Sequence, residues 1–206
     1  DDPERGFSYR RDGPLDMRMD RSRGRTAAQI LATIAETELV QALRELGDEA
    51  QAASIAAAVV QARAQAPLAR SRQLADLIQS ATGHVDWRLH AKPGRWQTHP
   101  AARTFQALRI LVNRELGNLA NLARVLPESL RPGGRAAIIS FHSGEDRLVK
   151  DAFRAGLRSG VLDRISEDLI RTEVAEREAN PRARSAKLRW ARKTASAAQG
   201  SLAESW

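Results

Sequence analysis

The stretch GGRAAIISFHSGEDRLVK, residues 133–150, decides the fold class. A Pro-Gly-Gly turn leads into an apolar run at residues 136–139, which is typical of a strand covered on both faces of a parallel sheet. Ligands of open parallel sheets bind outside the carboxyl ends of the strands. We therefore expect an α/β fold, with a site near the polar residues that end this strand. They are Ser140, His142, Ser143, Glu145 and Asp146.

The two acids of this stretch also have a simpler explanation. A helix is expected from about Glu145 to Leu157, so Glu145 and Asp146 fall in its first turn. Acidic side chains at this position interact favourably with the helix dipole. The sequence alone leaves a site role and a purely helical role open for both.

Composition indicates a globular protein with a polyanionic partner. The chain has 206 residues, of which 42% are apolar, enough for a hydrophobic core. Its formal charge of +8 is carried mostly by arginine. That excess favours nucleic acid, although arginine-rich chains also come from high-GC genomes.

Other functional classes are excluded by what the sequence lacks. There is no cysteine, which rules out disulfides, thiolate nucleophiles and zinc–cysteine sites, and we expect no metal. No apolar stretch is long enough to span a bilayer, and the first residues do not resemble a signal peptide. We expect a cytoplasmic protein with no membrane partner. No Walker loop or GxGxxG motif is present.

Acidic residues recur every fourth position in the loop-like segment DGPLDMRMD, residues 12–20. They are Asp12, Asp16 and Asp20. They could cap helices and pair with neighbouring arginines, or they could be carboxylates of a site. The sequence does not separate these two possibilities.

Helical periodicity follows from Thr26 onward and predicts a small bundle. Apolar residues recur at three- and four-residue intervals up to Gly47, then again over residues 53–66. Another helix is expected over residues 71–83, with Ser71 as its N-cap. The longest periodic stretch, residues 104–126, is expected to form one helix that ends before Pro127.

The segment between the last two of these helices combines tryptophan with basic residues. Trp87 and Trp96 lie beside Arg88, Lys92 and Arg95, a mixture that suits RNA stacking and equally suits buried anchors.

Two strands are expected near the end of the chain, around DLIRTEV and SAKLRWARK. In the second, Leu188 and Trp190 alternate with Lys187 and Arg189, which predicts an apolar buried face and a cationic face. An arginine-rich turn precedes this strand.

Four stretches in this order resemble the RsmH (MraW) family of methyltransferases. They are RGFSYRRDGPLDMRMD (5–20), HPAARTFQALRILVNREL (99–116), LRPGGRAAIISFHSGEDRLVK (130–150) and NPRARSAKLR (180–189). The resemblance implies transfer of a methyl group from S-adenosylmethionine to the exocyclic N4 of a cytidine in the decoding region of bacterial 16S ribosomal RNA. It implies that the partner is the small ribosomal subunit or its RNA, and not DNA.

The resemblance also implies a domain organisation. The expected fold is α/β, a partial Rossmann-like class I methyltransferase sheet with an inserted all-helical subdomain. Residues 1–25 would form an active-site loop, 26–104 the helical insert, 105–193 the C-terminal half of the core and 194–206 a flexible tail. Most cofactor contacts of the family precede the RGFS motif, so we expect a fragment that is inactive alone.

The resemblance suggests two sets of site residues. For the amine and the base edge, Asp12 and Asp16 are the candidates, with Ser140, His142 and Ser143 as the opposite wall. The candidates for RNA contacts are Arg18, Arg95, His99, Arg103, Arg182, Arg184 and Lys187. Arg103 has an equal alternative as an internal tie between the insert and the sheet.

Two functions of other classes compete with the enzyme. A chain without the cofactor-binding half is also compatible with a non-catalytic RNA-binding remnant. A helical interaction module whose partner completes the sheet is the third possibility.

Overall fold

The computed structural model describes residues 2–84 and 99–195. The chain forms two compact units, Asp1–Glu115 and Leu116–Trp206, and each is described by itself. Within the described ranges, no helix is both long and apolar enough to cross a membrane. The tail expected from residue 194 lies almost entirely outside these ranges.

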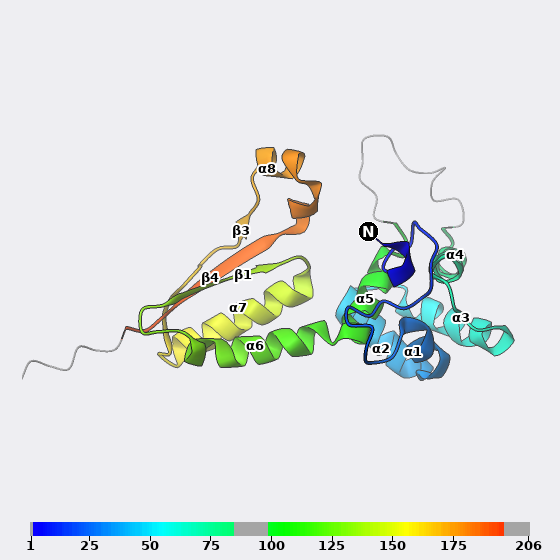
Figure 1. The fold of residues 1–206 in the computed structure, drawn as a ribbon, viewed down its shortest axis with the longest axis horizontal. Helices are drawn as coiled ribbons and strands as arrows, with labels where there is room; N and C mark the ends of the chain where they lie inside the picture. The colour runs from blue at the N-terminus through cyan, green and yellow to red at the C-terminus, as the bar shows by residue number, and fades with distance from the viewer. Residues whose placement is uncertain (1, 85–98, 196–206) are drawn as a thin grey trace, which may run out of the picture. The chain divides into compact units, whose positions relative to one another are not determined.

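The first unit is a helical bundle preceded by a long loop (Figure 1). Its elements are the 3-10 helix η1 (Pro3–Arg5) and the helices α1 (Ala27–Thr33), α2 (Glu36–Gly47), α3 (Ala52–Gln65), α4 (Ser71–Ala81) and α5 (Ala102–Asn113). The start of α1 is fixed by a capping box, because Thr26 accepts from the N–H of Gln29 and Gln29 accepts from the N–H of Thr26. The expected helices over residues 53–66 and 71–83 are confirmed, with the first shifted by one residue to Ala52–Gln65 and the second ending at Ala81.

The core of this unit joins the helices to the N-terminal loop. All five α-helices contribute to its largest fully buried side chains, which are Leu31, Leu39, Leu43, Ile55, Val59, Leu74, Ile78, Leu108 and Ile110. Leu15 and Met17 of the loop are buried to the same degree and belong to the same apolar cluster. The loop is therefore part of the core.

The prediction of a single helix over residues 104–126 is wrong. The chain forms α5 and then α6 (Glu115–Ser129), and Arg114 between them has a left-handed backbone with φ 52°. Asn113 explains the break, because its side chain bonds to the Met17 carbonyl and the Met19 N–H instead of facing solvent. Pro127 lies inside α6 and not after it.

The second unit packs helices on a small sheet (Figure 1). Its elements are α6, β1 (Arg135–Ser140), α7 (Ser143–Arg158), β2 (Leu162–Ile165), β3 (Ile170–Arg171), α8 (Val174–Ala179), the 3-10 helix η2 (Pro181–Ser185) and β4 (Lys187–Lys193). The strand order is β1-β4-β2, with β3 also paired to β4. The α/β class is confirmed. All strand pairs in the described residues are antiparallel, so the parallel pairing expected for β1 is not found there.

The buried faces of β1 and β4 both differ from expectation. β1 alternates between exposed and partly buried residues up to the buried Ser140 and is not covered on both faces; Ile139 is 56% exposed. In β4 the buried residues are Arg189 and Ala191, so the predicted apolar face of Leu188 and Trp190 is wrong. The physical reason is a partner for the cation: Arg189 donates to both carboxylate oxygens of Asp146 in α7, at 2.7 and 3.1 Å.

The core of the second unit lies between the sheet and its helices. Val149 and Phe153 of α7 pack with Leu162 of β2 and Ala191 of β4. Two leucines of α6, at positions 119 and 126, pack against the same cluster. This packing leaves the end of β1 and the start of α7 as a rigid strand-to-helix turn.

Candidate functional site

The loop at residues 12–20 is held firmly on the first unit. Pro14 forms a β-bridge with Arg70, and the Leu15 N–H donates to the Ala69 carbonyl at 2.8 Å. Ser71 is fully buried; its hydroxyl donates to the Arg11 carbonyl and accepts from the Gly13 N–H. Ser71 is thus the first residue of α4 and a clamp on the loop, and the prediction that it caps the helix is wrong.

Asp12 makes the contacts that the non-catalytic alternative predicted. Its carboxylate accepts from Arg70 Nε at 2.6 Å and from the Arg72 N–H, in the first turn of α4, at 3.2 Å. The Arg70 guanidinium holds the pKa of Asp12 below its usual value. The side chain is 40% exposed, so it combines this role with access to solvent.

Asp16 is the most enclosed acid of the loop. Its side chain is 7% exposed, and its two oxygens accept from Arg18 Nε at 2.7 Å and from a second Arg18 nitrogen at 3.0 Å. Arg21 lies 3.5 Å from the same carboxylate. The hydrogen bond from Arg18 lowers the pKa of Asp16, so the group is an ionised acceptor at neutral pH.

Arg18 is used inside the loop. Its remaining terminal nitrogen lies 3.4 Å from the Gly24 carbonyl, and the side chain is only 19% exposed. The guanidinium of Arg18 therefore orients the Asp16 carboxylate, and few of its donors remain for RNA.

Two further RNA candidates are also tied into the first unit. His99 is 6% exposed, and its ring stacks on Tyr9 with the centroids 4.5 Å apart. Arg103 donates to the Asp48 carbonyl at the end of α2, at 2.9 Å. Arg103 therefore forms an internal contact, as the alternative to RNA binding predicted. The contact joins two helices of the first unit, whereas the alternative placed it between the insert and the sheet. Tyr9 was missed, because a lone tyrosine in a loop gives no sequence signal for a stack.

A polar pocket of about 210 Å³ lies beside these residues. Its described lining is Glu49, Gln51, Thr82, His84, His99, Pro100 and Arg103. Arg95, Trp87 and Trp96 fall outside the described residues.

In the second unit, the candidate residues lie at the turn from β1 to α7. Ser140 is 3% exposed and donates to the Lys187 carbonyl on β4 at 3.4 Å. His142 is the N-cap of α7: its Nδ1 accepts from the Glu145 N–H at 3.3 Å. Ser143 follows as the first, exposed residue of the helix. The structure therefore brings these three candidates to one turn.

The Glu145 side chain contacts both Phe141 and His142 of this turn. One carboxylate oxygen accepts from the Phe141 N–H at 2.8 Å, and the other lies 3.3 Å from His142 Nε2, a buried atom without a hydrogen bond among the described residues. Burial raises the pKa of Glu145, but the His142 ring and the Phe141 N–H outweigh it and bring the pKa to about 2. Because Nδ1 accepts, a neutral His142 carries its proton on Nε2, facing the carboxylate.

The remaining arginine candidates lie in η2. Arg182 and Arg184 are exposed there, and Asn180 caps the turn by accepting from the Arg182 N–H at 3.3 Å. Lys187 follows at the start of β4, paired in register with Ser140.

Comparison with known proteins adds to this geometry. The family model described as the MraW methylase family matches residues 1–194. The chain belongs to this family. A relative from Acidobacterium capsulatum, named ribosomal RNA small subunit methyltransferase H, is 45% identical over 94% of this chain and 61% of its own length.

Other MraW relatives with the same name agree. The protein from Thioalkalivibrio sulfidiphilus is 46% identical over 95% of the chain and 64% of its own length. The protein from Nitrobacter hamburgensis is 42% identical over the whole chain and 63% of its own length. The chain thus spans about three-fifths of the length of these curated relatives. Both groups of candidate residues lie inside the part that matches the MraW family.

Proposed function

We propose that this chain acts in methyl transfer from S-adenosylmethionine to the exocyclic N4 of a cytidine in the decoding region of 16S ribosomal RNA. The observation that carries the proposal is the match of residues 1–194 to the MraW methylase family, with relatives named ribosomal RNA small subunit methyltransferase H. The charge of +8 supports a polyanionic substrate.

The described residues do not themselves fit as a cradle for the methyl donor. A nucleotide-like cofactor is commonly held by a glycine-rich turn whose N–H groups stay free at the start of a helix. The turn before α7 is filled by its own side chains: His142 accepts from the Glu145 N–H and Glu145 accepts from the Phe141 N–H. We assign no cofactor contact to these residues and derive no step through the cofactor.

The chemistry asked of this chain is to orient the cytidine amine and to polarise it. Carboxylates that accept amine hydrogens increase the electron density on nitrogen, and fixed acceptors cost little reorganisation. Asp16 is ionised and held by Arg18, so we propose it as an acceptor of an amine hydrogen. Asp12 is proposed as a second, more exposed acceptor.

The turn before α7 is proposed to contact the base edge. Ser140, His142 and Ser143 offer hydroxyl and imidazole groups on a turn made rigid by the Glu145 cap. A cytosine must leave its stack before such groups reach it. Arg182, Arg184 and Lys187 are proposed to bind phosphates, whereas His99 is left out because Tyr9 covers its ring.

A chimera tests this function directly. The Acidobacterium capsulatum relative would carry residues 1–193 of this chain in place of its own matching region, and methylated small-subunit RNA would be digested and analysed by mass spectrometry. We expect N4-methylcytidine. A folded chimera that binds the RNA but yields no methylated base would contradict the proposal and favour the RNA-binding remnant.

Asp16→Asn tests the acceptor, with Asp76→Asn as its control. Asp76 also pairs with an arginine, Arg72, but on the exposed side of α4. In the chimera, Asp16→Asn should lower turnover at unchanged RNA affinity, and Asp76→Asn should change neither. Equal turnover in both variants would remove Asp16 from the mechanism.

A further inference from the structure

Helix α7 carries a stripe of arginines on its outer side, formed by Arg147, Arg154 and Arg158. The three positions are separated by seven and four residues, which places them within an arc of about 40° on an α-helix. All three are exposed, and Val149 and Phe153 bury the other side of the helix against the sheet. The stripe runs for about 16 Å along the helix axis, at 1.5 Å per residue.

The stripe has little acidic compensation. Among the described residues, no ion pair or hydrogen bond engages the side chains of Arg147, Arg154 or Arg158. One acid, Asp151, lies on this exposed side, four residues after Arg147 and three before Arg154, and no ion pair joins it to either arginine among the described residues. Arginines four residues apart on a helix repel each other, so Arg154 gains nothing from its neighbour Arg158, which lies in the last turn of α7.

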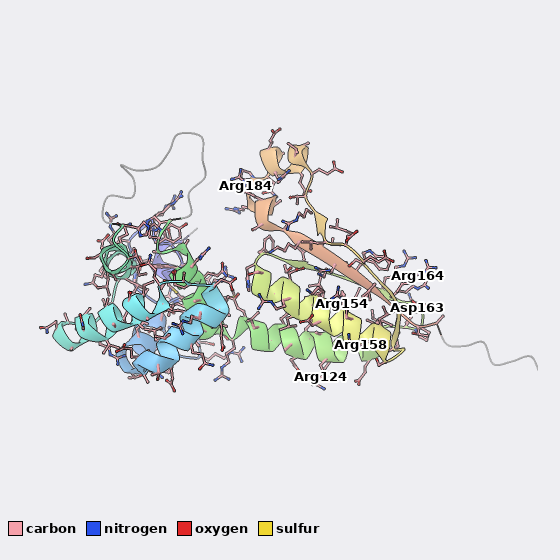
Figure 2. All side chains as sticks on the ribbon, turned by 180° about the vertical axis from the view of Figure 1, so that it is seen from behind. Arg124, Arg154, Arg158, Asp163, Arg164 and Arg184 are labelled. Carbon is pink, nitrogen blue, oxygen red and sulfur yellow. The ribbon has the colours of Figure 1, made fainter. Side chains whose placement is uncertain are left out.

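Arg164 extends the stripe beyond the helix. It is exposed on β2, the strand that packs against α7, next to the ion pair of Asp163 with Arg192. In Figure 2, Arg158 and Arg164 lie toward one end of the unit and Arg184 toward the other, with Arg154 between them along α7. The stripe is therefore separate from the arginines of η2 already proposed to bind RNA.

Helix α4 differs in this respect, because its Arg72 pairs with Asp76 at 3.2 Å. Such mixed surfaces are ordinary solvated helix faces. A row of three guanidinium groups with a single acid between them instead matches the regular negative charges of a nucleic-acid backbone, to which arginine binds through paired N–H donors.

We propose that the α7 arginine stripe, together with Arg164, is a second phosphate-binding surface for the RNA substrate. This inference rests on the proposed function, because it takes the partner to be RNA. The stripe binds the backbone without reading bases, so it contributes affinity and orientation and not sequence preference. It would hold a part of the RNA that lies away from the reacting base.

The salt dependence of RNA binding tests this surface. The full 206-residue chain would be titrated with a fluorescent transcript of small-subunit ribosomal RNA from about 50 to 200 mM salt. The test variant is Arg154→Gln/Arg158→Gln, which keeps helix propensity because the two residue types are similar. The matched control is Arg44→Gln/Arg72→Gln, with the same loss of charge from other helices. Circular dichroism checks that all chains fold.

We expect the slope of log K against log salt to become shallower by about 1.5 in the stripe variant, at 0.7 to 0.9 for each lost phosphate contact. The control should keep the slope of the unchanged protein, and Arg154→Lys/Arg158→Lys should restore most of it.

Three results would overturn the inference. An unchanged slope in the stripe variant, with normal binding by the unchanged chain, removes the stripe and leaves the proposed function intact. Equal flattening in stripe variant and control shows a general charge effect. Loss of binding to vesicles of anionic phospholipid, with RNA binding unaffected, assigns the stripe to a membrane surface.

Discussion

Replacing Glu145 by glutamine isolates the charge at the start of α7. Glutamine keeps an oxygen for the Phe141 N–H but loses the attraction to the His142 ring and to the helix dipole. The pKa of Glu145 falls from 4.5 to about 2, which corresponds to about 3 kcal/mol of folding free energy at neutral pH, at 1.36 kcal/mol per unit. Because the amide retains one hydrogen bond, we expect Glu145→Gln to cost about 2 kcal/mol.

The pH dependence gives this prediction its sign. A carboxyl whose pKa is depressed by folding stabilises the protein above its unfolded pKa, and this contribution is lost as the pH falls through its folded pKa. Urea unfolding of both chains should therefore show the full difference at pH 7 and a progressively smaller one from about pH 5 toward pH 2. A difference that is constant over this range, or absent at pH 7, would refute the electrostatic origin of the cap.

Two further sets of substitutions, one in each unit, probe the packing, with Gly117→Ala as a control. Asp146→Asn should destabilise the chain by about 3 kcal/mol, because it leaves the buried Arg189 without its charge partner, and adding Arg189→Met should recover part of the loss in a double-mutant cycle. Gly13→Ala should lower the melting temperature, since its Cβ would lie 2.1 Å from the Pro3 carbonyl oxygen, whereas Gly117→Ala in α6, with nothing within 4 Å, should raise it slightly.

Helices of the first unit could be predicted because their apolar spacing is set by one core. The positions of α3 and α4 follow from that spacing to within one or two residues at each end. The break at Arg114 could not be predicted, because apolar periodicity continues across it and the cause is a pair of hydrogen bonds from Asn113 to residues almost a hundred positions earlier. Sequence patterns report local preferences, and this contact is not local.

The strands show a second limit. Alternation in β4 was read correctly as two faces, but it does not say which face receives a helix. Arg189 lies inside because Asp146 is there to meet it, and Leu188 lies on the more exposed face. The charge of Arg189 alone favoured the opposite assignment, with Leu188 on the buried face.

The candidate site residues were predicted as types and positions, and the structure adds their partners. Asp16 was one of three equivalent acids in sequence and is the one that Arg18 encloses. Glu145 was a helix-dipole acid in sequence and turns out to hold a histidine cap. A pattern of acids cannot rank its members, because ranking depends on burial and on donors from distant segments.

Asn113 also has a consequence for protein engineering. Its side chain forms hydrogen bonds with the loop backbone at Met17 and Met19, while the Ser71 hydroxyl forms them with the same loop at residues 11 and 13. Transplanting residues 12–20 into another helical scaffold would therefore fail unless both anchoring points travel with the segment. Any swap between homologous proteins should be designed as a three-part exchange of the loop, the start of α4 and the end of α5.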